Sequence, residues 1–183
     1  MVPAAAVLAG GLSTRMGQDK ALLPWQGKTW LQHSMELLAQ LCQQCYVSGN
    51  YEGFACIPDL YEKRGPLGGI ASCLNAKPSK SAWLFCPVDM PLLSLSALEQ
   101  LVHSYQSKPG SYHFQDSLFP LIVQNTPDTR AVISQQLAQG DYRLRAFLKT
   151  IQSEALVSSE QPAVFGNVNT PQQWRDIQQL RSN

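Results

Sequence analysis

The chain has 183 residues, 44% of them hydrophobic, which is enough to bury a sizeable core and short enough for one domain over residues 1–183. Its 14 Lys and Arg residues against 13 Asp and Glu give a formal net charge of +1, which excludes a broad electrostatic attraction to nucleic acid or to an anionic membrane. Any phosphate binding must therefore depend on a local group of residues.

The first apolar run, residues 4–8, ends at Gly10 and Gly11 and predicts a buried parallel strand that leads into a loop. The longer apolar stretch from Val2 to Leu12 has no basic segment before it and is interrupted by the two glycines, so we expect neither a signal peptide nor a membrane span there. After the loop, Thr29 and Gln32 form a capping box, which predicts the start of a helix. Apolar residues at helical spacing then indicate that one face of this helix packs on a sheet.

Later segments alternate between strand and helix signals. Short apolar runs between turn residues predict strands at 45–48, 54–57, 82–86, 112–114 and 118–123. A helix is expected at 66–76, and Ser96 with Glu99 predicts a second capping box that opens a helix to about Tyr105.

Two further helices are expected to begin at Thr126-Pro127 and at Thr170-Pro171, because each pair places a hydroxyl at the N-cap and proline at the first helical position. Gln173 completes a capping box with Thr170. The alternation as a whole predicts an α/β fold: a single doubly wound, mostly parallel sheet with helices on both faces. Ligands of such a sheet bind beyond the carboxyl ends of the strands.

The segment from Leu8 to Lys20 reads LAGGLSTRMGQDK. Glycines after a strand allow backbone N–H groups to approach a polyphosphate, and Arg15 and Lys20 add positive charge beside them. The spacing fits neither a Walker A loop nor the G-x-G-x-x-G dinucleotide fingerprint. A Gly-Gly pair by itself is more often an ordinary turn, so the prediction of a phosphate-binding loop depends on the full string.

A second candidate is Asp89, which follows an apolar strand in the string WLFCPVDMP, residues 83–91. A carboxylate at the end of a strand suits an Mg²⁺ ligand that faces phosphates, since Mg²⁺ prefers one or two carboxylates together with substrate oxygens. An isolated aspartate at such a place is equally often a turn or cap residue.

Together these motifs resemble the molybdenum cofactor guanylyltransferases, a family of nucleotidyltransferases. The resemblance spans nearly the whole chain in the same order, and it includes Asp59, GPLGGI at 65–70, the arginine-bearing segment 142–148 and FGNVNTP at 165–171. It implies a Rossmann-like nucleotidyltransferase fold. It also implies that Mg²⁺ is the cofactor and that GMP passes from GTP to the phosphate of molybdenum-molybdopterin, with release of pyrophosphate.

The resemblance implies roles for single residues. Arg15, Lys20 and Asp89 act in catalysis, and Asp89 holds the metal. Asp59 accepts hydrogen bonds from the guanine N1 and N2 edge. Ser48 stands where some members have a nucleotide-contacting asparagine. The full set implied for the nucleotide and cofactor is Leu8, Ala9, Gly10, Gly11, Lys20, Ser48, Asp59, Asp89, Asn167 and Asn169.

The chemistry needs no general base. The acceptor is a phosphate monoester with a second pKa of about 6, so its attacking oxygen is already ionised at neutral pH. What the reaction needs is charge neutralisation and an in-line approach to the α-phosphorus. Phe119 stands where some members carry a histidine, so that polar contact to the pterin is absent here. Trp25, just past the loop, is a candidate for lining a pterin surface.

Five cysteines are an odd number for a disulfide framework, and this favours reduced thiols and a cytoplasmic protein. Cys42 and Cys45 form a C-x-x-C, but no second pair at zinc spacing accompanies them, so we expect a structural role. Because the pterin is unstable, transient contact with cofactor-synthesis proteins or molybdoenzyme chaperones is also expected.

Two alternatives stay open from the sequence. One is a sibling enzyme on the same scaffold that uses CTP or a sugar phosphate acceptor. The other is a non-catalytic carrier module that binds GTP or the pterin. A carboxylate such as Asp59 favours guanine over cytosine, because the N1 and N2 edge of guanine only donates hydrogen bonds.

Overall fold

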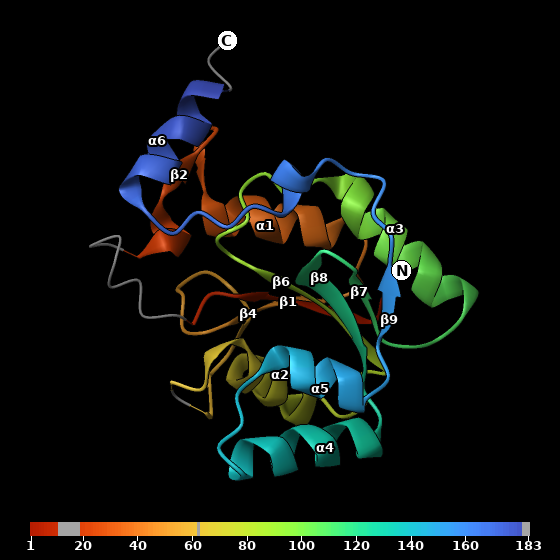
Figure 1. Ribbon diagram of the computed structural model, residues 1–183. Helices are drawn as coiled ribbons and strands as arrows, with labels where there is room; N and C mark the ends of the chain where they lie inside the picture. Colours follow the sequence, from red (N-terminus) through yellow and green to blue (C-terminus); the bar gives the residue numbers. More distant parts are fainter. Residues whose placement is uncertain (11–18, 62, 181–183) are drawn as a thin grey trace.

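A mixed sheet forms the centre of the protein in the computed structural model, which describes residues 1–10, 19–61 and 63–180 (Figure 1). Within these residues the sheet has seven strands in the order β5-β4-β1-β6-β8-β7-β9. Strand β8 runs antiparallel to its two neighbours, and the other neighbouring pairs are parallel. The strands are β1 (Ala4–Leu8), β4 (Cys45–Ser48), β5 (Cys56–Ile57), β6 (Ala82–Pro87), β7 (Tyr112–Phe114), β8 (Ser117–Gln124) and β9 (Glu154–Leu156).

Helices cover both faces of this sheet (Figure 1). One face carries α1 (Trp30–Ala39) and α3 (Leu95–Ser107), and the other carries α2 (Gly65–Ala76), α4 (Pro127–Ala138) and α5 (Leu144–Thr150). The predicted α/β architecture with a mostly parallel sheet is therefore confirmed. The remaining elements are the 3₁₀ helices η1 (Lys20–Leu22) and η2 (Pro162–Phe165), the hairpin of β2 (Pro24–Trp25) and β3 (Lys28–Thr29), and the last helix α6 (Pro171–Leu180).

The two central strands are buried on both sides, and their side chains alternate between two cores. In β1, Ala5 and Val7 pack in the core under α1 and α3, whereas Ala4 and Ala6 pack in the core under α2. Strand β6 repeats this pattern, with Trp83 on the α2 side. Such continuous apolar runs are typical of parallel strands with helices on both faces, which is why they were readable in the sequence.

The local helix signals were mostly correct. Thr29 caps α1, and both hydrogen bonds of the predicted capping box are present: Gln32 N donates to Thr29 Oγ1, and Thr29 N donates to Gln32 Oε1. The box predicted at Ser96 is wrong: Ser94 is the N-cap of α3 and accepts from Ala97 N at 3.1 Å. Ser94 also donates to Glu160 at 3.0 Å, a tertiary contact that the local pattern could not reveal.

The strand predicted at 54–57 is shorter than expected. Phe54 N donates to Tyr51 O at 3.4 Å, which keeps residue 54 in a turn, and β5 begins only at Cys56. None of the helices in the described ranges combines the length and the apolar character needed to cross a bilayer.

The strand order places a topological switch between β1 and β6. From β1 the chain passes through α1 to β4 and on to β5 at one edge, and then returns through α2 to β6 on the other side of β1. Connections that leave in opposite directions open a crevice at the carboxyl ends of the two strands. The segments that follow β1 and β6 are those that carry Lys20 and Asp89.

The first turns of α2 pack very closely on the preceding loop and on the sheet, which explains two glycines of the GPLGG string. A Cβ on Gly68 would lie 2.8 Å from Tyr61 O, and one on Gly69 would lie 2.7 Å from Ser48 Oγ and 3.2 Å from Leu8 Cδ2. Ser48 is 1% exposed and has little room to move. Gly69 therefore allows helix α2 to approach the ends of β1 and β4, and Gly68 allows it to approach the loop at Tyr61.

We expect Gly69→Ala to lower the free energy of unfolding by about 1 to 3 kcal/mol, the usual effect of overpacking. In an open helix position the same change would stabilise by roughly 1 kcal/mol, so the direction of the effect is diagnostic. Urea denaturation measures it, with Asn75→Ala on the same helix as the control. Unchanged or increased stability of Gly69→Ala would contradict the close packing.

Candidate functional site

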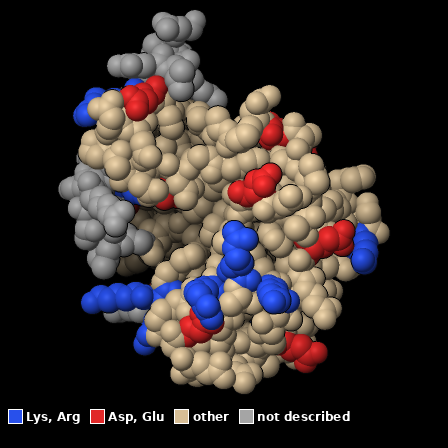
Figure 2. Space-filling model, viewed as in Figure 1, with Lys and Arg blue, Asp and Glu red and all other residues tan. Residues whose placement is uncertain are grey.

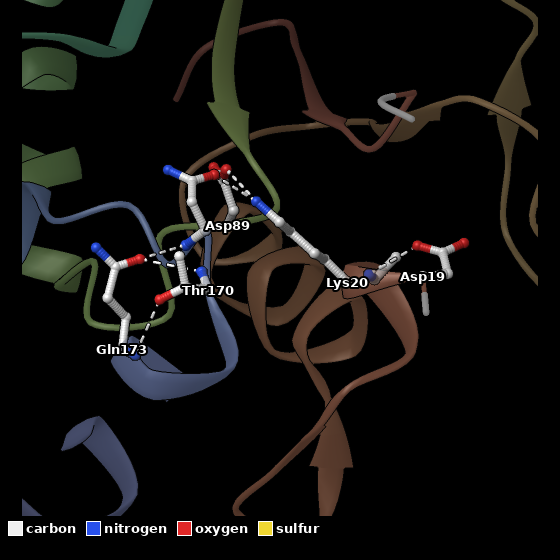
Figure 3. Close-up of polar contacts among 7 residues, drawn as sticks. Asp19, Lys20, Asp89, Thr170 and Gln173 are labelled. Atoms are coloured by element: carbon white, nitrogen blue, oxygen red, sulfur yellow. Dashed lines mark hydrogen bonds and ion pairs between the residues drawn. The ribbon is translucent and has the colours of Figure 1, made fainter. Parts of the chain in front are cut away.

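Lys20 begins the short helix η1, and its backbone is fixed locally. Asp19 is the N-cap of η1 and accepts from Ala21 N at 2.9 Å, while Leu23 N donates to Lys20 O at 3.1 Å. The side chain of Ala21 is fully buried. With the backbone held in this way, the Lys20 side chain extends toward the end of β6 (Figure 3).

Asp89 lies just past β6, where the chain is held from two sides. Val88 N donates to Leu8 O at 3.2 Å, and Val168 N donates to Asp89 O at 2.9 Å. The Asp89 carboxylate forms an ion pair with the Lys20 amine, which donates a hydrogen bond from Nζ to Oδ2 at 3.1 Å. The side chains of Lys20 and Asp89 are only 13% and 19% exposed, so this ion pair is largely shielded from water.

Asn169 brings a third segment to the same point. Its amide oxygen Oδ1 lies 2.5 Å from Lys20 Nζ, so two oxygens from different segments converge on one cationic group (Figure 3). Asn167 is exposed two positions earlier, and the buried Val168 between them anchors the segment. The structure thus brings Lys20, Asp89 and Asn169 together and leaves Asn167 outside this cluster.

The glycine turn after β1 lies beside Ser48 and Asp59. Ala9 N donates to Ser48 O at 3.2 Å, and a Cβ on Gly10 would lie 3.6 Å from Ser48 O and 3.9 Å from Asp59 Oδ2. The side chains of Leu8 and Ser48 turn toward α2, as their closeness to Gly69 shows. A nucleotide contact from Ser48 stays a prediction, and the part of Ser48 that faces the glycine turn is its carbonyl oxygen.

Asp59 is oriented by its own neighbours. Its Oδ1 accepts from Tyr61 N at 2.9 Å and from Ser72 Oγ at 3.2 Å. Ser72 is fully buried in α2, so the carboxylate cannot rotate freely. The second oxygen, Oδ2, is the one that faces Gly10. Among the described residues it has no hydrogen bond of its own, which leaves an acceptor directed at the glycine turn.

Tyr51 is a polar contact that sequence reasoning missed. Its hydroxyl lies 2.9 Å from Asp19 Oδ2 and 3.2 Å from Ala9 O, so it bridges the end of β1 and the start of η1. Burial raises the pKa of Tyr51 far above its ordinary value, and the hydrogen bond to the Asp19 carboxylate raises it further. No spacing in the sequence marks this tyrosine, because the bridge depends on where β4 ends relative to β1.

Gly11 and Arg15 lie outside the described residues, so their predicted roles stay predictions. Trp25, a candidate for a pterin-lining surface, is only 4% exposed and packs 5.5 Å from Trp174 between ring centroids. It therefore belongs to the core. Burial raises the pKa of Cys45 to about 11 and that of Cys42 beyond this, so both thiols of the C-x-x-C are neutral at pH 7.

Positive charge is unevenly spread despite the small net charge. Figure 2 shows basic side chains gathered over α5 on the face in view, where Arg143, Arg145 and Lys149 are exposed. Arg143 pairs with Asp141 through two nitrogens at 2.7 and 2.8 Å, and its guanidinium lowers the pKa of Asp141 to about 2. An anionic ligand can thus meet local attraction on a nearly neutral protein.

The convergence at Lys20 also indicates which ligands the site suits. A carboxylate and an amide oxygen around a cationic group form a set of hard oxygen donors of the kind that Mg²⁺ binds in proteins. The described ranges contain no group of three or more His, Cys, Asp or Glu that could hold a metal by protein ligands alone. A metal held by these two oxygens would take its remaining ligands from substrate or water, as is usual when Mg²⁺ binds with phosphates.

Comparisons with known proteins show which proteins the chain resembles. A Xanthomonas euvesicatoria pv. vesicatoria protein named "Molybdenum cofactor guanylyltransferase" is 38% identical over 172 residues, which is 92% of this chain and 90% of that protein. A solved Archaeoglobus fulgidus structure, "Molybdopterin-guanine dinucleotide biosynthesis protein A", superposes with a TM-score of 0.79 at 18% identity and covers 98% of each chain.

The same fold also occurs with another named activity. The 2-C-methyl-D-erythritol 4-phosphate cytidylyltransferase of Thermus thermophilus superposes with a TM-score of 0.72 at 15% identity, covering 100% of this chain and 99% of that one. At such identities the likeness concerns the fold alone. Residues 5–157 match the family described as the MobA-like NTP transferase domain. With this match and the 38% identical relative, the resemblance seen in the motifs is confirmed, and the chain belongs to the MobA-like NTP transferase family.

Proposed function

We propose that this protein transfers GMP from GTP to the phosphate of molybdenum-molybdopterin, in a reaction that depends on Mg²⁺. The observation that carries the proposal is the convergence of the Lys20 amine, the Asp89 carboxylate and the Asn169 amide oxygen beside the switch between β1 and β6. The name of the relative that is 38% identical supports the choice of substrates.

In the proposed complex the nucleotide lies along the carboxyl ends of β1 and β4. Backbone groups from Leu8 to Gly11 contact the nucleotide and its phosphates, and Arg15 and Lys20 neutralise their charge. Asp59 Oδ2 accepts from the guanine N1 and N2 edge, since it faces Gly10 and its partner oxygen is already occupied. Asn167 and Asn169 lie toward the acceptor side.

The transfer step needs no base from the protein. An ionised oxygen of the acceptor phosphate attacks the α-phosphorus of GTP, a new P–O bond forms, and the bond to the bridging oxygen of the leaving pyrophosphate breaks. Lys20 neutralises negative charge as it accumulates on the phosphates. Asp89 and Asn169 would hold Mg²⁺, which when bound supplies further charge neutralisation.

The cellular setting proposed is the cytoplasm, and the free thiols found at all five cysteines support it. Transient contact with cofactor-synthesis proteins or molybdoenzyme chaperones belongs to the same proposal, because an unstable pterin is best passed directly between proteins. A pull-down from cells tests this, and a result with no partner of either kind counts against it.

The direct test is transfer from GTP labelled at the α-phosphate. Label should appear in a pterin dinucleotide and pyrophosphate should be released only when GTP, Mg²⁺ and molybdenum-molybdopterin are all present. Transfer from CTP, or to a sugar phosphate, would instead support the sibling enzyme, for which the fold shared with a cytidylyltransferase is the specific reason. Binding of GTP with no transfer to authentic acceptor would favour the carrier module.

We expect Asp59→Asn to remove the preference for guanine. The asparagine amide oxygen can keep the bonds from Tyr61 N and Ser72 Oγ, so the atom that faces Gly10 changes from an acceptor into an NH₂ donor. Losing a charged hydrogen bond costs about 1.5 to 3 kcal/mol, or roughly 10- to 100-fold in affinity. Thermal shift with GTP, CTP, ATP and UTP in the presence of Mg²⁺ measures the change.

The matched control for this change is Asp116→Asn, which removes the same charge at the exposed turn between β7 and β8. In the unaltered protein GTP should give the largest stabilisation, in line with its lower dissociation constant. Selective stabilisation by CTP, or an unchanged GTP preference in Asp59→Asn, would overturn the assignment of Asp59 to the base.

A further inference from the structure

The turn that carries Asn169 is held by the first turn of α6. Gln173 Oε1 accepts from Asn169 N at 2.8 Å and from Thr170 N at 3.1 Å, and Gln173 N donates to Thr170 Oγ1 at 3.2 Å (Figure 3). This is the capping box expected from the sequence, extended by one residue toward the site. The backbone of Asn169 is thereby tied to α6 while its side chain meets Lys20.

Helix α6 is in turn anchored by aromatic packing. Trp174 is 9% exposed, and its ring centroid lies 5.5 Å from that of Trp25 and 4.9 Å from that of Trp30. Aromatic pairs at such distances are stabilising beyond the area they bury. The position of Gln173, next to Trp174, is therefore fixed by the core of the protein.

The segment from Lys20 to Trp25 contacts the segment from Asn169 to Trp174 at two places, one polar and one aromatic. Lys20 Nζ meets Asn169 Oδ1, and a few residues further along each segment Trp25 meets Trp174. The aromatic contact fixes how the two segments lie relative to each other. Gln173, next to Trp174, then fixes the Asn169 backbone through the hydrogen bond from Asn169 N. A third tie, Val168 N to Asp89 O at 2.9 Å, places the other side of the turn against β6.

From these contacts we infer that Gln173 is a positioning residue for the transfer reaction. The inference rests on the proposed function of the site. Within the described ranges the Gln173 side chain accepts from Asn169 N and Thr170 N, and it acts by holding Asn169 so that the amide oxygen of Asn169 meets the Lys20 amine. Without it, two backbone N–H groups lose their acceptor and the Asn169 turn gains freedom to move.

The variant Gln173→Ala should lower kcat by about 10-fold with a smaller effect on KM for GTP, as losses of supporting hydrogen bonds commonly do. Gln173 is exposed, so the fold should be retained. Gln173→Glu should restore most of the activity, because a carboxylate at this position accepts the same N–H groups and suits a helix N-terminus. An activity of Gln173→Ala equal to that of the unaltered protein would overturn the inference.

Gln172 provides the matched control. It is exposed in the same turn, and its side-chain hydrogen bonds among the described residues are with Asp176 at 2.7 Å and with Arg175 at 2.7 Å, both exposed on α6. Gln172→Ala should leave kcat and KM unchanged. An equal loss in both variants would assign the effect to helix stability and contradict a specific role of Gln173.

A double-mutant cycle separates positioning from a general effect. Asn169→Ala removes the group that Gln173 is inferred to hold, so adding Gln173→Ala to it should cause no further loss in kcat. Losses that multiply would show that Gln173 acts independently of Asn169. Tm values of the four proteins identify any variant that is merely destabilised, and Gln173→Leu, which is similar in size, then replaces Gln173→Ala.

A readout without turnover keeps this inference separate from the proposed function. The ¹⁵N signal of the Lys20 ammonium group, assigned by its loss in Lys20→Arg, should be visible in the unaltered protein and in Gln172→Ala, because a hydrogen-bonded amine exchanges protons slowly. It should broaden in Gln173→Ala. An unchanged signal there would overturn the positioning role even if GMP transfer is confirmed, whereas failure of transfer with the expected signals would overturn only the proposed function.

Discussion

Replacing Asp89 with alanine or asparagine is expected to lower kcat for GMP transfer by about 10² to 10³-fold, the range seen when one group that stabilises transition-state charge is removed. The carboxylate follows β6, is 19% exposed and already attracts a cation at 3.1 Å. Asparagine keeps the shape and removes the charge, so a metal that relies on one protein carboxylate loses most of its attraction. Pyrophosphate release with both substrates present measures the effect.

Two comparisons make the Asp89 result specific. Asp116→Asn, at the exposed turn before β8, should leave activity unchanged. In Asp89→Asn, raising the Mg²⁺ concentration should recover activity only partly, because the lost ligand weakens metal binding as well as turnover. Full activity of Asp89→Asn at ordinary Mg²⁺ concentrations would remove the metal role from this residue.

The second large effect is expected for Lys20→Gln, which should reduce kcat/KM for GTP by roughly 10² to 10³-fold. Here the amine, held by Asp89 and Asn169 and only 13% exposed, is replaced by a neutral amide that cannot neutralise phosphate charge. Unlike Asp89→Asn, this variant should show weaker GTP binding at every Mg²⁺ concentration. Titration calorimetry with Mg²⁺ and GTP distinguishes the two.

Lys28→Gln is the matched control for Lys20→Gln. Lys28 lies on β3 and is 47% exposed in a surface ion pair with Glu36, so its loss should change neither binding nor turnover. Lys20→Arg is informative as well, because it keeps the charge but replaces a point charge with a planar fork. Activity of Lys20→Gln close to that of the unaltered protein would rule out a role for this amine in transfer.

Much of the fold could be predicted from local sequence patterns, the helix caps above all. Thr29, Thr126 and Thr170 were identified as helix caps from neighbouring residues alone, and their hydrogen bonds are present as expected. Capping depends on residues three positions apart, which is why sequence reasoning succeeds there. The exception is α3, where two serines compete and a distant partner, Glu160, accompanies the cap at Ser94.

The site was predictable in part, for a physical reason. In a doubly wound sheet the crevice lies where connections diverge, so residues just after β1 and β6 are brought together by topology, and Lys20 and Asp89 do meet. The contacts of Tyr51 could not be foreseen, and neither could the bond from Asn169 N that extends the predicted capping box of Gln173, since both depend on where segments outside the local pattern come to lie.

The residues that meet at Lys20 lie far apart in the sequence, and this affects the order in which the site forms during folding. The Lys20 amine meets a carboxylate 69 residues away and an amide 149 residues away. Contacts this distant form late in folding, because the intervening chain must be ordered first. A ribosome-bound chain from which Asn169 has not yet emerged therefore lacks one of the three groups that meet at the site. Under the proposed function, its affinity for GTP should rise once this residue has emerged and docked.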